Sequence, residues 1–140
     1  MSILAKTLVL GLAVAMLLSL TACGGRDLTP EEQVDKGELS EAFTLMRDRK
    51  WYQASLKFRD ILRDHPDYQE GWHNLGLCYD MLADWERAID AYEHAISVSP
   101  NDLDARSRLH LAIDLLRVNS GARAVPLLEE CREKLPRDYL

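Results

Sequence analysis

The stretch from Trp72 to Pro100 constrains the fold of this chain more than any other part of the sequence. Trp72, Leu75, Gly76 and Tyr79 follow one another at i, i+3, i+4 and i+7. In a helix this spacing places all four side chains on one face. The pattern therefore predicts a first helix whose packed face combines large aromatic residues with a glycine that allows close approach of a neighbour.

A second helix follows, with Ala88, Tyr92 and Ala95 on one face at the same helical spacing. Asp84 stands where a side chain would cap the start of this helix, and Pro100 lies beyond its expected end. Small residues on both helices permit close contact, and the aromatic rings fill the remaining space. The stretch thus predicts an antiparallel helical hairpin.

The same pattern recurs 34 residues earlier. Trp51, Ala54, Phe58, Ile61 and Pro66 correspond to Trp85, Ala88, Tyr92, Ala95 and Pro100. The first helix of this earlier hairpin matches less well, since its apolar stripe is rotated by about one residue and consists of Leu39, Ala42, Phe43 and Met46. We expect this helix to run from about Pro30 to Asp48, with Thr29 as its cap and Glu32 completing a capping box.

A third copy lies 36 residues after the central one. Its matching residues are Leu111, Ala112, Leu115, Ala124, Leu128, Cys131 and Pro136. We expect the two additional residues in the connection 101–104. Pro126 falls within the last expected helix and predicts either a late start of that helix or a bend near Ala124.

The central stretch resembles the tetratricopeptide repeat, whose pattern of Trp, Leu, Gly and Tyr followed by spaced Ala, aromatic, Ala and Pro it matches at most positions. The resemblance implies an all-α fold: a short solenoid of three antiparallel helical hairpins, wound as a right-handed superhelix, over residues 30–138. The repeats would span about residues 35–68, 69–102 and 105–138. The chain continues for only four residues after Pro136, so we expect the face of the last hairpin to be partly exposed, or covered by a partner or a second copy as a homo-oligomer.

The N-terminus has the order of a secretory signal: Lys6 is followed by an apolar run from Thr7 to Ala22. This run is short for a spanning helix, which needs about 20 residues. Its end, Leu20-Thr21-Ala22-Cys23, resembles the lipobox of bacterial lipoproteins.

The lipobox resemblance implies a signal peptide over residues 1–22, cleavage between Ala22 and Cys23, fatty acylation of Cys23, and a tether over 23–29. Gly24, which is not the Asp of inner-membrane retention, implies an outer-membrane anchor facing the periplasm. A soluble exported product and an uncleaved anchor remain as alternatives.

The composition favours a binding protein over an enzyme. With 17 Lys and Arg against 23 Asp and Glu, the formal net charge of −6 argues against nucleic-acid binding. We find no catalytic motif, no metal-spaced pair among the four histidines and no Cys-x-x-Cys pair, and so expect no catalytic residue, metal, cofactor or small-molecule substrate. Cys78 and Cys131 are predicted to be small buried packing residues rather than a disulfide.

In tetratricopeptide proteins the first helices of successive repeats line a concave surface that holds a peptide or helix. The corresponding groove residues would be Leu39, Phe43, Met46, His73, Asn74, Leu77, Met81, Arg106, Leu109, His110 and Ile113. Asn74 matches a position that often bonds a peptide backbone, while Arg106 and His110 stand near positions that contact a peptide carboxylate. The alternative is that many of these residues are buried between helices.

These inferences predict a lipid-anchored periplasmic adaptor that binds a protein or peptide partner and has no catalytic activity. Family resemblance indicates a role in envelope assembly, of the pilus and secretion type or of the outer-membrane assembly type. The alternatives are a structural subunit of a larger envelope complex that uses its uncapped C-terminal end, and an accessory subunit of a cell-wall enzyme.

Overall fold

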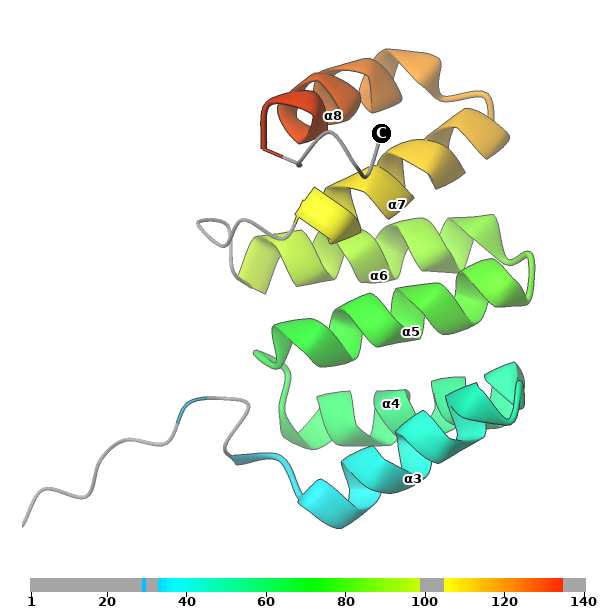
Figure 1. The fold of residues 1–140 in the computed structure, drawn as a ribbon, viewed down its shortest axis with the longest axis vertical. Helices are drawn as coiled ribbons and strands as arrows, with labels where there is room; N and C mark the ends of the chain where they lie inside the picture. The colour runs from blue at the N-terminus through cyan, green and yellow to red at the C-terminus, as the bar shows by residue number, and fades with distance from the viewer. Residues whose placement is uncertain (1–28, 30–32, 99–104, 135–140) are drawn as a thin grey trace, which may run out of the picture.

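The structure is a computed structural model that describes residues 29, 33–98 and 105–134. Within these ranges the chain forms six α-helices and no strand: α3 (Lys36–Arg47), α4 (Trp51–Asp64), α5 (Gln69–Met81), α6 (Trp85–Val98), α7 (Ala105–Arg117) and α8 (Gly121–Lys134). Each helix packs against the next in chain order, so the helices pair into hairpins that stack along one axis (Figure 1). The predicted all-α stack of three hairpins is confirmed.

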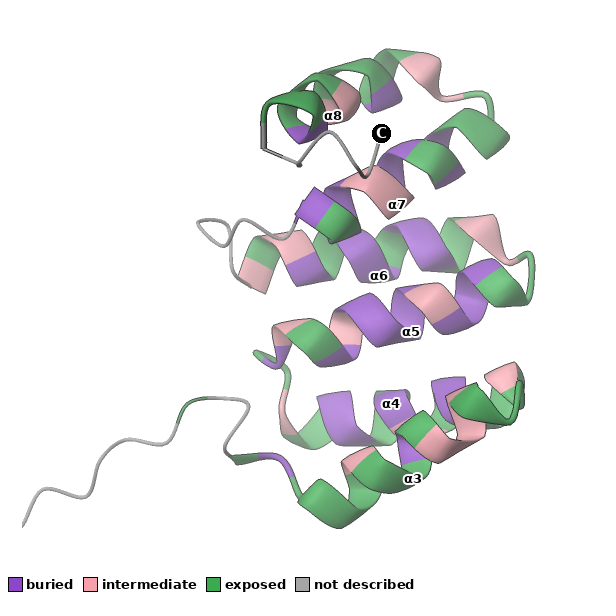
Figure 2. Cartoon of the chain, viewed as in Figure 1, coloured by how far each residue is buried: buried purple, intermediate pink, exposed green. Residues whose placement is uncertain are grey.

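Equivalent residues of the three hairpins occupy equivalent places. Ala54, Ala88 and Ala124 are all fully buried, at the point where the second helix of each hairpin approaches the first. Phe58 and Tyr92, which follow one turn later, are also fully buried and fill the spaces beside these alanines. Burial therefore recurs at the spacing that the sequence predicts, and Figure 2 shows it along the helices.

The turns inside the hairpins also repeat. Arg49, Ala83 and Asn119 have φ angles of 59°, 57° and 59°, in the left-handed region that side chains other than glycine rarely adopt. These positions are separated by the same 34 and 36 residues as the core positions. The three hairpins therefore turn through one backbone shape. The connection 101–104, where the additional residues were expected, lies outside the described residues.

The predicted continuous helix from Pro30 to Asp48 is interrupted. Gln33 is helical and its N–H donates to the Thr29 carbonyl at 3.1 Å, but Val34 and Asp35 are not helical, and α3 begins at Lys36. The reason is Asp35, whose Oδ1 accepts hydrogen bonds from the N–H groups of Gly37 (2.7 Å) and Glu38 (3.0 Å) and so caps a new helix. Residues 30–32 lie outside the described part of the chain.

Of the two outcomes predicted for Pro126, a late start of the last helix or a bend near Ala124, the late start does not occur, because α8 begins at Gly121. The N–H groups of Arg123 and Ala124 donate to the Ser120 carbonyl at 3.0 and 3.3 Å, so the first turn forms ahead of the proline. Pro126 lies in the second turn, where its missing N–H removes a single helical hydrogen bond. One lost bond does not prevent the helix from forming.

Cys78 and Cys131 are free thiols in the interior. Cys78 lies in the core cluster, and the Cys131 thiol donates to the Ala105 carbonyl at 3.4 Å. Their predicted role as small packing residues is confirmed. Burial raises the pKa of the Cys78 thiol to about 12.

Candidate functional site

The first helices of the hairpins expose large apolar side chains. Phe43 of α3 is 40% exposed, Met81 of α5 is 53% exposed, and Ile113 and Leu116 of α7 are 36% and 48% exposed. We call these four residues the first-helix surface. Leu39, Met46, Leu77 and Leu109, which were predicted to line the same groove, are half-buried. Part of the predicted groove is therefore apolar and open to solvent.

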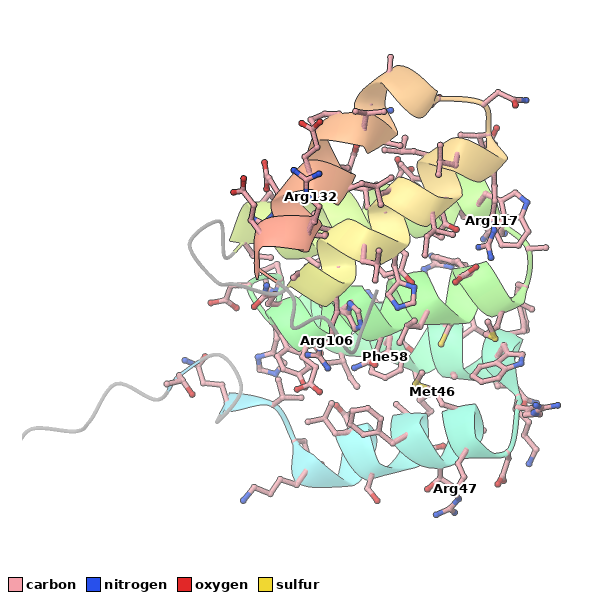
Figure 3. The ribbon with its side chains drawn as sticks, turned by 45° about the horizontal axis from the view of Figure 1, so that its top comes forward. Met46, Arg47, Phe58, Arg106, Arg117 and Arg132 are labelled. Carbon is pink, nitrogen blue, oxygen red and sulfur yellow. The ribbon has the colours of Figure 1, made fainter. Side chains whose placement is uncertain are left out.

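Phe43 is held in place by the core beneath it. Its ring meets the ring of the fully buried Phe58 edge-on, with centroids 5.8 Å apart. Met46 is half-buried and packs against the core cluster that contains Phe58 (Figure 3). The rotated apolar stripe of α3 thus packs on α4 with one edge while presenting Phe43 to solvent, which fixes its orientation.

His73 and Asn74, also predicted to line the groove, lie in the interior of the structure. Nδ1 of His73 shares a hydrogen bond of 2.8 Å with Oγ of the buried Ser107, which links α5 to α7. The Asn74 amide donates to the Glu70 carbonyl of its own helix at 2.9 Å. His73 therefore helps to position α7 on α5, Asn74 is held against its own helix, and neither side chain faces an open surface.

Beside the first-helix surface, a charged network joins α5 to α7. Nη1 of Arg117 donates to Asp80 at 2.5 Å and to Asp114 at 2.6 Å. The Arg117 guanidinium also lies 4.3 Å from the centre of the Trp85 ring, where a cation–π contact stabilises it. No sequence pattern connects Trp85 with this pair of carboxylates, because the contact depends on how the hairpins stack.

The interior part of this network carries an electrostatic cost. Asp114 is fully buried, and burial raises the pKa of its carboxyl although Arg117 opposes the shift. Its Oδ2 atom and the Tyr92 hydroxyl have no hydrogen-bond partner within the described part of the chain. Burial likewise raises the pKa of Tyr92. The network therefore fixes the relative positions of α5 and α7 without being fully satisfied.

Of the remaining predicted residues, Arg106 (Figure 3) is exposed at the start of α7, and His110 is half-buried. The His110 ring stacks on Tyr92 with centroids 5.5 Å apart, and its Nδ1 lies 3.9 Å from the Asp80 carboxylate. Arg106 lies near one end of α7 and Arg117 at the other.

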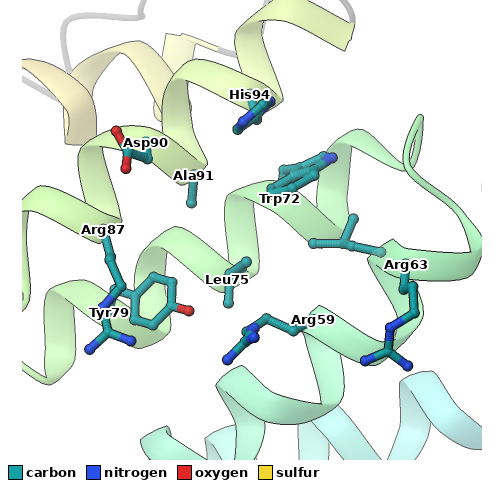
Figure 4. A pocket seen from close by; sticks show the side chains of 10 residues that line it. Arg59, Arg63, Trp72, Leu75, Tyr79, Arg87, Asp90, Ala91 and His94 are labelled. Atoms are coloured by element: carbon teal, nitrogen blue, oxygen red, sulfur yellow. The ribbon is translucent and has the colours of Figure 1, made fainter.

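A pocket that the sequence analysis did not anticipate lies away from these residues, between α4, α5 and α6 (Figure 4). Its volume is about 360 Å³. It is lined by Arg59, Leu62, Arg63, Trp72, Leu75, Tyr79, Arg87, Asp90, Ala91 and His94. The sequence signal that points to it is a reversal of charge at equivalent repeat positions, where Arg59 corresponds to Glu93 of the next repeat.

Across the described ranges, no group of three or more His, Cys, Asp or Glu residues is arranged to hold a metal ion. In the same ranges no helix is both long enough and apolar enough to cross a bilayer. The apolar run 7–22 and Cys23 lie outside the described residues.

Stacked helical hairpins with small residues at their contacts form an all-α solenoid of the kind that tetratricopeptide repeats build. Residues 70–102 match the family model of the tetratricopeptide repeat. Over 80 residues, or 57% of this chain, the sequence is 28% identical to the tetratricopeptide repeat domain-containing protein PYG7, chloroplastic, of Arabidopsis thaliana. The chain covers 27% of the length of that relative.

Solved structures show the same fold. The type III secretion chaperone SycD of Yersinia enterocolitica, in complex with a peptide of the translocator YopD, superposes with a TM-score of 0.67 at 20% identity, over 73% of this chain and 76% of that chain. MamA AMB-1 superposes with a TM-score of 0.64 at 19% identity, over 69% of this chain and 51% of that chain. The described helices thus form a short tetratricopeptide-like solenoid.

Proposed function

We propose that this protein is a non-catalytic adaptor that binds a protein or peptide partner through the first-helix surface. The observation that carries this proposal is the exposure of Phe43, Met81, Ile113 and Leu116 along the first helices of a packed stack. Such side chains lose contact with water when a partner covers them, which favours association. The peptide complex of SycD supports a binding role for this kind of fold.

The chemistry of the surface favours an amphipathic helix as the bound segment. Its exposed residues are Phe, Met, Ile and Leu, and the Arg117–Asp80 pair joins α7 to α5, the two helices that carry Met81, Ile113 and Leu116. An amphipathic helix would place its apolar stripe on the exposed side chains and its polar edge near this pair.

The experiment compares two variants in photo-crosslinking in intact cells. Met81→Asp combined with Ile113→Asp places charges on the first-helix surface, whereas Val125→Asp alters a residue of α8 that is also 53% exposed. We expect the double variant to lose the partner that crosslinks to a photoreactive residue at Phe43, and the Val125→Asp variant to keep it. A double variant that folds and keeps every partner would contradict the proposal.

A lipid anchor at Cys23 completes the proposed function and would hold the adaptor at the envelope membrane, facing the periplasm. This part rests on the Leu-Thr-Ala-Cys sequence and on the preceding apolar run. Mass spectrometry of the mature protein should find an acylated N-terminal Cys23, and Cys23→Ser should release the protein from the membrane fraction. An unmodified Cys23 within an uncleaved chain would contradict the anchor while leaving the adaptor role open.

The role in envelope assembly is part of the same proposal and concerns the identity of the partner. Val125 is an exposed apolar residue of the last helix and favours a second candidate, a structural subunit that binds through its C-terminal end. If the Val125→Asp variant loses the partner and the double variant keeps it, this second candidate is supported.

A further inference from the structure

The pocket between α4, α5 and α6 has an apolar floor and a basic rim. Leu62, Leu75, Tyr79 and Ala91 are buried residues that form the floor. Arg59 and Arg63 of α4 and Arg87 of α6 are exposed residues that line the same pocket. Figure 4 shows the three arginines around the Leu75 and Tyr79 side chains. A volume of about 360 Å³ falls within the range of sites that bind small ligands or peptide side chains.

The next pair of hairpins provides an internal comparison. The equivalent cleft lies between α6, α7 and α8, and the repeat offsets place Glu93 where Arg59 stands and Arg123 where Arg87 stands. Glu93 and Arg123 form an ion pair that links α6 to α8. Arg108 Nε and Glu130 Oε2 form a second pair, 3.2 Å apart, at the positions where Trp72 and His94 stack in the first cleft. Two ion pairs therefore link the helices that surround the second cleft.

The first cleft lacks the corresponding acidic residue. Arg59 has no carboxylate within ion-pair distance in the described part of the chain. Arg87 pairs with Asp84 of its own hairpin and lies 4.7 Å from the centre of the Tyr79 ring. Ala91, at the position of Leu127 in the second cleft, also leaves the floor less filled. The first cleft therefore combines the guanidinium groups of Arg59 and Arg87 with unfilled apolar space.

We infer that this pocket binds a segment of a partner protein in which a Glu or Asp is flanked by an apolar residue. The carboxylate pairs with Arg59 and Arg87 and so reproduces the contact that Glu93 makes with Arg123. The apolar neighbour packs on Leu62, Leu75 and Ala91. Asp90, which also lines the pocket, repels groups of higher negative charge and favours a single carboxylate. This surface is formed mainly by α4 and α6 and is separate from the first-helix surface.

Two variants of the full chain copy the second cleft. Arg59→Glu introduces the glutamate that the next repeat carries at Glu93, and Ala91→Leu introduces the leucine that it carries at Leu127. The fold therefore already accommodates both side chains at equivalent positions. The control is Arg132→Glu, which makes the same change of charge at an exposed site on α8. Circular dichroism establishes that each variant is folded before binding is measured.

The probes are two libraries of amidated hexapeptides, with a central Glu or a central Gln and apolar residues on both sides. We expect the parent chain to prefer the Glu peptides. Each variant should weaken their binding by about tenfold or more, because Arg59→Glu removes the charge pair with the carboxylate and Ala91→Leu blocks the apolar floor. Arg132→Glu should retain binding.

Equal binding of the Glu and Gln libraries would overturn the inference. A second result would also overturn it. If the parent chain binds phosphatidylglycerol vesicles, Arg59→Glu abolishes this binding, and the Glu and Gln peptides bind equally, the pocket recognises a membrane surface. The Met81→Asp and Ile113→Asp double variant leaves this pocket unchanged and should still prefer the Glu peptides. The two proposed surfaces can thus fail independently.

Discussion

Gly76 lies against the ring of Tyr92 so closely that a Cβ atom there would be 2.6 Å from Tyr92 Cε1. Tyr92 is fully buried, so its ring can move away only by displacing its packed neighbours. The first and third hairpins carry Ala42 and Ala112 at this position, opposite Phe58 and Leu128. Among the three hairpins, the central one thus combines a glycine at this position with a tyrosine opposite it.

Gly76→Ala should destabilise the protein by about 1–2 kcal/mol, since overpacking exceeds the gain in helix propensity. Urea unfolding followed by circular dichroism measures the change. Gly121→Ala is the control, because its Cβ would meet nothing nearer than 3.9 Å, and it should leave stability equal or slightly higher. Equal stability of the Gly76→Ala variant would show that Tyr92 can shift.

The buried cysteines should react with thiol reagents only when the structure opens. Burial raises the pKa of Cys78 to about 12, so almost no thiolate exists near neutral pH, and both thiols are shielded from solvent. In a Cys23→Ser chain we expect Ellman's reagent to modify Cys78 and Cys131 at the rate of unfolding. Rapid modification of the native protein would contradict this packing.

At the scale of helices, the Asp80–Asp114–Arg117 network makes stability depend on pH. Burial raises the pKa of Asp114 above its ordinary value of 3.8. The folded protein therefore holds this proton more tightly than the unfolded chain does, and the contribution of Asp114 to the free energy of unfolding falls as pH rises from 3.8 through the raised pKa. Above that pKa this contribution is fully lost.

Asp114→Asn removes this dependence. The stability of the parent chain relative to the variant should therefore decrease as pH rises from about 4 to 7, as measured by urea unfolding at each pH. A relative stability that stays constant or increases would indicate that the attraction of Arg117 outweighs burial.

Helix pairing was predictable from sequence because it depends on residues at fixed spacing. Ala54, Ala88 and Ala124 locate the close contact in each hairpin whatever surrounds them. The start of α3 was predicted wrongly because Thr29 and Asp35 both offer a cap, and local sequence does not rank them. The burial of His73 and Asn74 depends on how α7 covers α5, which no single repeat specifies.

At the scale of the whole molecule, the pocket lined by Arg59 and Arg87 was missed because its residues come from three helices. The available signal was the charge at repeat-equivalent positions, where Arg59 replaces Glu93. Comparison of core positions alone does not detect such a change. Exposed side chains on the first helices were easier to predict, since Met81 and Ile113 follow directly from helical periodicity.

A stack in which each helix contacts mainly its neighbours should open from its ends. We expect amide hydrogen exchange to be slowest in α5 and α6, which have hairpins on both sides, and faster in α3 and α8 (Figure 1). Mass spectrometry of peptic fragments checks this order. Exchange in α8 as slow as in α5 would indicate that the last hairpin is covered.

The left-handed turns at Arg49, Ala83 and Asn119 share one backbone shape although their side chains differ in size and charge. All three are exposed, so the shape does not depend on what the side chain contacts. These corners are therefore suitable attachment points for spectroscopic labels. Fluorophores on cysteines placed at Arg49 and Asn119, with the native thiols shielded, would report changes in the curvature of the stack when a partner binds.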